Sequence, residues 1–342
     1  MKKIDLKSCN LEELKEILTS LGEKSFRAKQ LFKWIHEKLI EEIEHITVFS
    51  DKLKEKIENE YYIGNIKILK KFESKLDNTI KYLFLLEDGN IIESVRMKYK
   101  HGNSLCLSTQ VGCKMGCEFC ASTKEGLVKN LSPSEILDQV YKIKKDINEE
   151  ISNIVLMGSG EPLDNYDNVI KFIRLLNDKD GQNLSNRNIT LSTCGLVPEI
   201  YKLAEENIPI TLSISLHSSF DAERRKIMPI ANKYTIEEII DATKYYINTT
   251  NRRVTFEYTL INNVNDRKED AEKLSELLRG MLCHVNIIPL NPIKESNLIT
   301  SNYAKEFKEL LTKKGINATI RREMGADINA ACGQLRSDYM KY

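Results

Sequence analysis

The chain has 342 residues, 51 Lys and Arg against 50 Asp and Glu, and a formal net charge of +1. This length allows one large domain and a smaller one, while the balanced charge excludes a strongly basic tail for nucleic acid or an anionic membrane. Since the N-terminus lacks the apolar stretch of a secretory signal and no apolar run approaches membrane-spanning length, we expect a cytoplasmic protein with no membrane contact. Its eight cysteines are then expected to be metal ligands, catalytic thiols or core residues rather than structural disulfides.

Residues 1–62 are predicted to form a small helical N-terminal domain of three helices. Asn10 and Glu13 form a plausible capping box for the first helix, which Gly22 would end. The second helix, around residues 26–38, carries Trp34 beside several basic residues. Such a face could contact RNA, but acidic residues are about as frequent here, so an ordinary solvated surface over a small core is the favoured interpretation.

Short β-type runs replace the helical pattern from residue 64 onward. They cover residues 66–69, 80–86, 91–97 and 104–108, and Asp88-Gly89 is a strong two-residue hairpin signal between the second and third. We therefore predict a connecting β-hairpin segment over residues 63–100.

Beyond residue 101, apolar β-branched runs alternate with amphipathic segments of helical length. Ser132-Pro-Ser-Glu135 provides one of these helices with an N-cap, a first-turn proline and a reciprocal glutamate. The alternation predicts an α/β fold: a partial (β/α)6 TIM-like barrel over residues 101–322, followed by a C-terminal segment at 323–342. The predicted barrel strands are residues 104–108, 154–157, 189–192, 210–216, 254–260 and 285–289. In such a fold the functional residues gather at the C-terminal ends of the strands.

Three cysteines, Cys113, Cys117 and Cys120, stand at spacings of four and three residues. A structural zinc site normally has four ligands in two close pairs, and the sequence has no second close pair. An iron–sulfur cluster needs one ligand per iron, so a four-iron cluster held by three cysteines leaves one iron open for a substrate or cofactor. The spacing therefore favours a [4Fe-4S] cluster, with zinc as the alternative.

Polar residues follow four successive predicted strands. Taken singly, each of them could be an ordinary turn or loop residue, and His217 could be a hydrogen-bonded residue at the rim of the sheet. Together they offer donors and acceptors with little net charge, as a cofactor bearing an amine, a carboxylate and ribose hydroxyls requires. The candidate cofactor-binding residues are Gly160, Glu161, Ser192, Ser215, Leu216, His217 and Asn291.

The cysteine loop resembles the signature of radical S-adenosylmethionine (SAM) enzymes, and Gly160-Glu161-Pro162 resembles that superfamily's amine-binding motif. Across residues 24–336, further motifs resemble the RlmN family of dual-specificity ribosomal and transfer RNA adenine-C2 methyltransferases. Those motifs are Cys106, Ser215-Leu-His217, residues 252–258, Asn291-Pro292 and residues 327–335. Two departures from the family pattern are Ser159, where Met is common, and the additional thiol of Cys194.

The resemblance implies that Cys113, Cys117 and Cys120 hold the [4Fe-4S] cluster and that SAM is both methyl donor and radical source. It implies that Cys332 accepts the methyl group, that Cys106 later forms a disulfide with it, and that Glu93 accepts a proton. From the residues alone, Cys332 is more typical of a small buried side chain, and Glu93 of a polar residue on a hairpin strand. The implied substrates are adenine 2503 of 23S rRNA and adenine 37 of tRNA, with a flavodoxin- or ferredoxin-type electron donor and a monomeric enzyme.

Three alternatives stay open at this point. The related Cfr enzymes methylate C8 of the same ribosomal adenine. A radical enzyme that activates a glycyl radical or inserts sulfur would use the same cluster, but it would need neither Cys106 nor Cys332. A zinc-dependent RNA-binding protein would need no iron at all.

Overall fold

The computed structural model describes residues 3–335, so the end of the segment predicted at 323–342 lies outside the described residues. The first part of the chain contains α1 (Leu11–Ser20), α2 (Phe26–His36) and α3 (Asp51–Glu60), with 3-10 turns η1 (Leu6–Ser8) and η2 (Ile43–His45). Strands β1 (Ile4–Asp5) and β2 (Tyr61–Tyr62) pair in parallel and bring its two ends together. The predicted capping box is present at the start of α1, because the Asn10 side chain and Glu13 each accept the other's backbone N–H.

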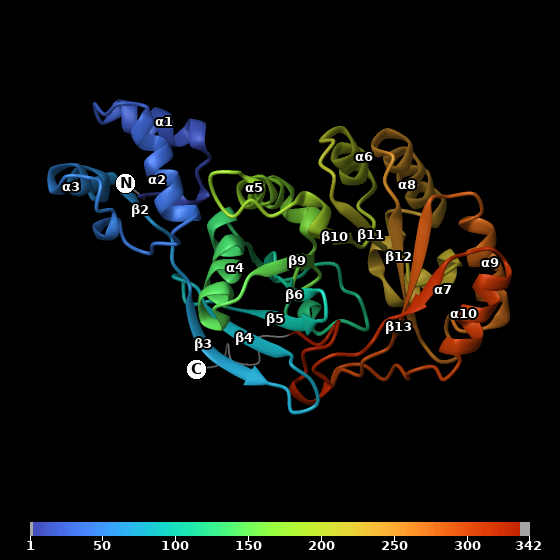
Figure 1. Ribbon diagram of the computed structural model, residues 1–342. Helices are drawn as coiled ribbons and strands as arrows, with labels where there is room; N and C mark the ends of the chain where they lie inside the picture. The colour runs from blue at the N-terminus through green and yellow to red at the C-terminus, as the bar shows by residue number, and fades with distance from the viewer. Residues whose placement is uncertain (1–2, 336–342) are drawn as a thin grey trace.

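A ten-stranded sheet forms the centre of the molecule (Figure 1). Its strands are β3 (Lys67–Glu73), β4 (Ile80–Leu85), β5 (Ile91–Tyr99), β6 (Gly102–Cys106), β9 (Ile151–Leu156), β10 (Ile189–Thr193), β11 (Thr211–Ser215), β12 (Val254–Leu260), β13 (Cys283–Pro289) and β14 (Ala318–Ile320). They lie in the order β14-β13-β12-β11-β10-β9-β6-β5-β4-β3. The strands from β3 to β6 pair antiparallel, and those from β6 to β14 pair in parallel.

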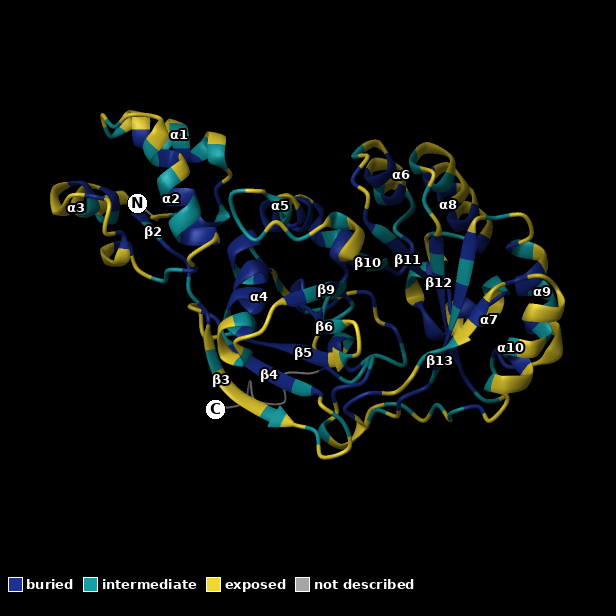
Figure 2. Ribbon diagram, in the orientation of Figure 1, coloured by how far each residue is buried: buried dark blue, intermediate teal, exposed yellow. Residues whose placement is uncertain are grey.

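Helices cover the outer side of the parallel strands (Figure 1). They are α4 (Pro133–Ile147), α5 (Tyr166–Asn177), α6 (Val197–Glu205), α7 (Asp221–Ile227), α8 (Ile236–Thr250), α9 (Lys268–Leu277) and α10 (Ala304–Lys313). In α5 the buried residues Val169, Phe172, Ile173 and Leu176 recur every three or four positions, which places them on one face. Figure 2 shows the result: the parallel strands are largely buried, the edge strand β3 is largely exposed, and the helices are exposed on their outer faces. Within residues 3–335, no helix combines the length and apolarity that crossing a bilayer requires.

The predicted α/β fold with a parallel sheet under helices is confirmed, and apart from shifts of a few residues in strand bounds the structure differs from the prediction in two details. A seventh parallel strand, β14, follows the six predicted ones, but its three residues are too short to give a pattern. The turn between β4 and β5 contains three residues rather than two, since the Leu86 N–H donates to the Asn90 carbonyl across Glu87, Asp88 and Gly89. Gly89 has a φ of 84°, as such turns require.

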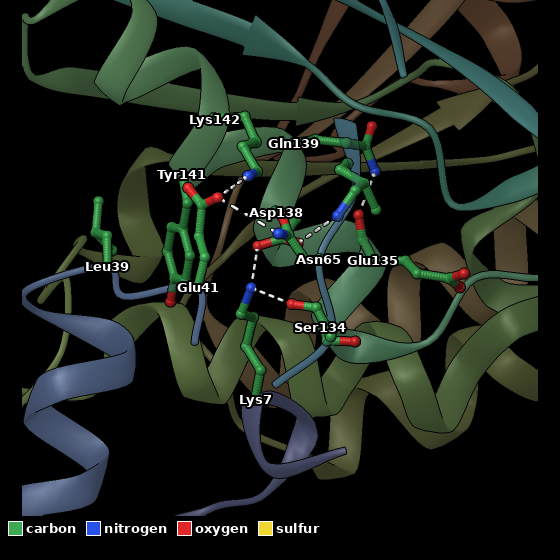
Figure 3. A network of polar contacts seen from close by, with 12 residues as sticks. Lys7, Leu39, Glu41, Asn65, Ser134, Glu135, Asp138, Gln139, Tyr141 and Lys142 are labelled. Atoms are coloured by element: carbon green, nitrogen blue, oxygen red, sulfur yellow. Dashed lines mark hydrogen bonds and ion pairs between the residues drawn. The ribbon is translucent and has the colours of Figure 1, made fainter. Parts of the chain in front are cut away.

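The first part of the chain is attached to α4 through a buried ion pair (Figure 3). The Lys7 ammonium lies 2.5 Å from the Asp138 carboxylate, and both side chains are 2% exposed. Lys7 also donates to the Gly64 carbonyl, and Asp138 accepts the Ile66 N–H at 3.0 Å. Further contacts link His36 to Tyr141, and Glu41 to Lys142 and Lys145. These contacts hold the N-terminal helices against the barrel.

Candidate active site

A cavity opens at the C-terminal ends of the parallel strands, the edge where this fold class places functional residues. It encloses about 940 Å³, its open mouth included. Ten of the predicted site residues line it: Cys113, Cys117, Cys120, Gly160, Glu161, Ser192, Ser215, His217, Asn291 and Cys332. The other three lie elsewhere. The Leu216 side chain is fully buried in the core, while Cys106 and Glu93 line two further cavities.

The cysteine loop lies between two short antiparallel strands, β7 (Gln110–Gly112) and β8 (Leu127–Asn130). Gly112 has a φ of 72°, and a Cβ there would lie 1.9 Å from the Gly126 carbonyl oxygen, so only glycine permits this close approach. Burial and the neighbouring thiols of Cys120 and Cys113 raise the pKa of Cys117 well above its usual value. Thiolates at these positions therefore need cationic compensation.

The same three thiols all line the wall of this cavity. Within residues 3–335, no group of three His, Cys, Asp or Glu side chains is arranged to hold a metal ion. A cluster that takes one thiol per iron needs spread donors rather than three sulfurs converging on one point. The donor type and burial therefore fit an iron–sulfur cluster.

The residues after β9 form a rigid acceptor site. Gly160 has a φ of 105°, and a Cβ there would lie 2.6 Å from the Cβ of Gln110. The Glu161 N–H donates to the Gln110 side chain at 2.9 Å. The Glu161 carboxylate, 4% exposed, accepts the N–H groups of Leu163 at 3.0 Å and Cys194 at 2.7 Å. Burial raises the pKa of Glu161, and the backbone N–H donors oppose that rise.

Neutral hydrogen-bonding groups follow β10 and β11. The hydroxyls of Ser192 and Ser215 lie 3.4 Å apart on adjacent strands. The His217 Nδ1 accepts the Thr259 N–H at 2.9 Å, so its proton resides on Nε2. Burial, followed by the charge of Arg224, lowers the pKa of His217 to about 3. His217 is therefore a neutral hydrogen-bond donor at any working pH.

The C-terminal segment closes one side of this cavity. The Asn291 side-chain amide donates to the carbonyl of Cys332 at 3.0 Å. The next residue, Gly333, accepts the N–H of Ala121 at 2.8 Å, directly after the third cysteine of the loop. These bonds fix Cys332 beside the cysteine loop although the two are more than two hundred residues apart in the sequence.

Cys106 and Cys332 both line a second cavity of about 570 Å³, its open part included. Cys332 thus lies on the wall that the two cavities share. Both residues are free thiols. Burial, and next the charge of Cys332, raise the pKa of Cys106 to about 12. The geometry brings two thiols from distant parts of the chain to one cavity, as thiol–disulfide chemistry requires.

Glu93 lies in a third cavity of about 450 Å³, its open part included. Its carboxylate is 3.8 Å from the Lys81 ammonium and 3% exposed. Leu335 lines both this cavity and the one that holds Cys106 and Cys332. The structure therefore brings Glu93 close to the thiol pair but not into the same cavity.

Two charged residues of the cavity wall were missed by sequence reasoning. Arg321 lines both larger cavities, and its guanidinium is 3.9 Å from the Glu257 carboxylate. Glu257 accepts the Ser213 hydroxyl at 2.8 Å and the Asn286 amide at 2.7 Å. The charge of Cys332, partly opposed by burial, raises the pKa of Arg321. In the sequence, the signal for Glu257 was a single glutamate inside the otherwise apolar strand at 254–260.

Comparison with known proteins identifies the family of this chain. A family model of the radical SAM superfamily matches residues 107–278, and one of the ribosomal RNA large subunit methyltransferase N-terminal domain matches residues 4–63. A probable dual-specificity RNA methyltransferase RlmN from Lachnoclostridium phytofermentans is 55% identical over 98% of this chain and 95% of its own. The chain belongs to the RlmN family of radical SAM RNA methyltransferases.

Further members and a solved structure agree with that assignment. The probable dual-specificity RNA methyltransferase RlmN of Clostridium novyi is 56% identical over 97% of both chains. The crystal structure of a radical SAM methyltransferase from Sphaerobacter thermophilus has 39% identity and a TM-score of 0.92 over 97% of this chain and 99% of its own. Membership in the radical SAM superfamily implies an iron–sulfur cluster and SAM. The three thiols of the cysteine loop and the hydrogen-bonding groups at the strand ends suit those two groups.

Proposed function

We propose that this RlmN-family enzyme methylates C2 of adenine, at adenine 2503 of 23S rRNA and adenine 37 of tRNA. The observation that carries the proposal is the shared cavity of Cys106 and Cys332, next to the cysteine loop. A cluster enzyme of another class has no use for such a thiol pair. The names of the relatives, probable dual-specificity RNA methyltransferases, support the methylation of RNA by an enzyme with two specificities.

The chemistry explains why two thiols are needed. C2 of adenine lies between two electron-withdrawing ring nitrogens, so it does not attack the sulfonium methyl of SAM as a nucleophile. In the proposed reaction the Cys332 thiolate displaces S-adenosylhomocysteine from one SAM and becomes S-methylcysteine. When bound, the cluster and a second SAM supply a 5′-deoxyadenosyl radical. Cys332 loses a hydrogen atom from its S-methyl group to that radical, and the resulting carbon radical adds to C2.

Release of the product uses the other two residues. Addition to C2 leaves the RNA covalently attached to the Cys332 sulfur through the methylene carbon. Glu93 takes the C2 proton, and the unpaired electron of the adduct would leave to the oxidised iron–sulfur cluster that Cys113, Cys117 and Cys120 would hold, which restores the aromatic ring. The Cys106 thiolate then attacks the Cys332 sulfur, so that the carbon–sulfur bond breaks as the disulfide forms, and the released methylene carbon takes up a proton to become the methyl group. Because Leu335 lies between their cavities, this assignment requires Leu335 to move when RNA binds.

The neutral wall residues are proposed to hold SAM. Glu161 is the acceptor for its amino group, and the strand-end residues Ser192, Ser215, His217 and Asn291 bind its carboxylate and ribose, with Leu216 contributing only its backbone. Cys113, Cys117 and Cys120 are the proposed cluster ligands.

RNA recognition is proposed to involve three parts of the chain. These are the accessory domain at 1–62, the connecting segment at 63–100 and the barrel at 101–322, which the C-terminal segment completes. The edge strand β3 exposes Lys67, Lys70 and Lys71, and Lys75 follows it. Since the target adenine must leave its stack to reach the cavity, these lysines are proposed to bind phosphates and hold the surrounding RNA. We further propose a monomeric cytoplasmic enzyme with a flavodoxin- or ferredoxin-type electron donor.

The Cys106→Ala variant tests the proposal. It leaves the methyl-accepting Cys332 and the cluster ligands in place but removes the thiol that resolves the crosslink. RNA covalently bound to the protein through Cys332 should accumulate, with no free methylated product, as seen on denaturing gels and by mass spectrometry. Normal turnover by Cys106→Ala would contradict the proposed thiol pair. Cys283→Ala, which alters a buried thiol in β13 away from these cavities, is the control.

A further inference from the structure

Arg224 is the largest fully buried side chain of the described residues, and it carries a charge that nothing in contact with it neutralises. It lies in α7 and is 0% exposed. Its Nε donates to the Leu216 carbonyl at 3.0 Å, and its Nη2 donates to the Cys194 carbonyl at 2.7 Å and to the Ser215 carbonyl at 3.4 Å. Among residues 3–335, no carboxylate lies within ion-pair distance of it, and its Nη1 has no hydrogen-bond partner.

An arginine in that position is energetically unusual. Guanidinium groups stay protonated in proteins, and a buried charge is normally paired. Three carbonyl oxygens supply partial negative charge but leave a net positive charge and one unsatisfied N–H group. Asp221, one turn earlier in α7, acts on Arg224 only from a distance, and its Oδ1 already accepts the N–H of Ile236. A purely structural role would therefore be served better by a neutral donor.

The contacts of Arg224 and of α7 place this arginine close to the cysteine loop. It is not part of the cavity wall, but it binds the backbone of two segments that form this wall, at Cys194 and at Ser215-Leu216. Cys194, whose carbonyl Arg224 binds, packs in one cluster with Cys117 of the loop and Ile227 of α7. Burial lowers the pKa of Arg224, and the Cys194 and Cys117 thiols, when ionised, oppose that lowering. The end of α7 is also joined to the cysteine loop, because the Glu118 N–H donates to the Ile227 carbonyl at 2.9 Å.

We propose that Arg224 is the buried counter-charge of the iron–sulfur cluster held by Cys113, Cys117 and Cys120, and that it raises the reduction potential of that cluster. An iron–sulfur core carries less positive charge than three thiolates carry negative charge, so the unit is anionic and gains a further negative charge on reduction. A fixed cation bound to Cys194, next to Cys117, stabilises the reduced form more than the oxidised form. This inference rests on one part of the proposed function, the presence of the iron–sulfur cluster, and does not depend on the RNA substrate or its methylation.

The test is a redox titration of the reconstituted protein, followed by electron paramagnetic resonance and made without SAM so that the SAM carboxylate does not contribute. Arg224→Gln should shift the midpoint potential to more negative values, and Arg224→Lys, which keeps the charge, should retain most of the wild-type potential. Arg225→Gln is the matched control, since it removes the neighbouring but exposed arginine of the same helix and should leave the potential unchanged.

The possible outcomes are separable. A protein that takes up no iron in its wild-type form refutes the proposed function itself. A cluster that forms but has the same potential in Arg224→Gln as in the wild type overturns the inference and leaves the function standing. Equal shifts in Arg224→Gln and Arg224→Lys, or failure of both variants to fold, also overturn it, because Arg224 would then serve only to hold the carbonyls.

Discussion

Replacing Lys7 by Met removes one partner of the buried pair that attaches the N-terminal helices to α4 (Figure 3). The change leaves the Asp138 carboxylate, 2% exposed, with the Ile66 N–H as its remaining close donor, and leaves the Gly64 carbonyl without its ammonium partner. Breaking a buried ion pair on one side typically costs about 3–5 kcal/mol. We expect a loss of that size in the free energy of unfolding.

Urea unfolding followed by circular dichroism measures this loss. In the double variant Lys7→Met/Asp138→Asn both charges are gone and an acceptor for Ile66 remains, so about 1–3 kcal/mol of the loss should be recovered. Lys15→Met is the control, because its ion pair with Glu12 is exposed and should be worth less than about 1 kcal/mol. If Lys7→Met unfolds within 1 kcal/mol of the wild type, the buried pair does not hold the two parts together.

Three further predictions concern pH, SAM and RNA. Burial lowers the pKa of His36 to about 3, so below pH 6.5 the unfolded chain takes up a proton that the folded chain does not. The free energy of unfolding should therefore fall below about pH 6.5, by up to about 1.4 kcal/mol per pH unit from this group. His36→Phe should reduce that slope in acid unfolding curves. Gly160→Ala places a Cβ 2.6 Å from the Gln110 Cβ at a φ of 105°, and calorimetry should find SAM binding weakened by about tenfold or more. Reversing the charge of Lys75 should weaken RNA binding and reduce its logarithmic salt slope by about one unit, whereas an unchanged slope would exclude Lys75 from phosphate contact.

Local signals explain why most of the fold could be predicted from the sequence. The β12 run of alternating β-branched and aromatic residues was predicted with its observed bounds, 254–260, and the capping boxes at Asn10 and Ser132 are both present. These features depend on residues within a few positions of one another. Strand β14 has only three residues, and its pairing with β13 depends on the whole sheet, so no local pattern predicts it.

Some residues of the candidate site could likewise be predicted from local sequence, and others could not. Residues in short motifs, such as Cys113 and Glu161, could be identified from spacing and from the resemblance. Arg224 and Arg321 could not, because their contacts with thiols, carbonyls or carboxylates far away in the sequence, and the complete burial of Arg224, appear only in the fold. Surface arginines are common, and the apolar pattern of α7 does not reveal which of its basic residues turns inward.

Analysis of the methylated nucleoside shows directly whether this enzyme methylates C2 of adenine. Ribosomal and transfer RNA lacking the modification would be incubated with the anaerobically reconstituted enzyme, SAM and a chemical reductant, then digested to nucleosides and separated by mass spectrometry. We expect 2-methyladenosine from the wild-type enzyme and none from Cys332→Ala reactions. The appearance of 8-methyladenosine alone, or methylation that persists in Cys332→Ala, would contradict it.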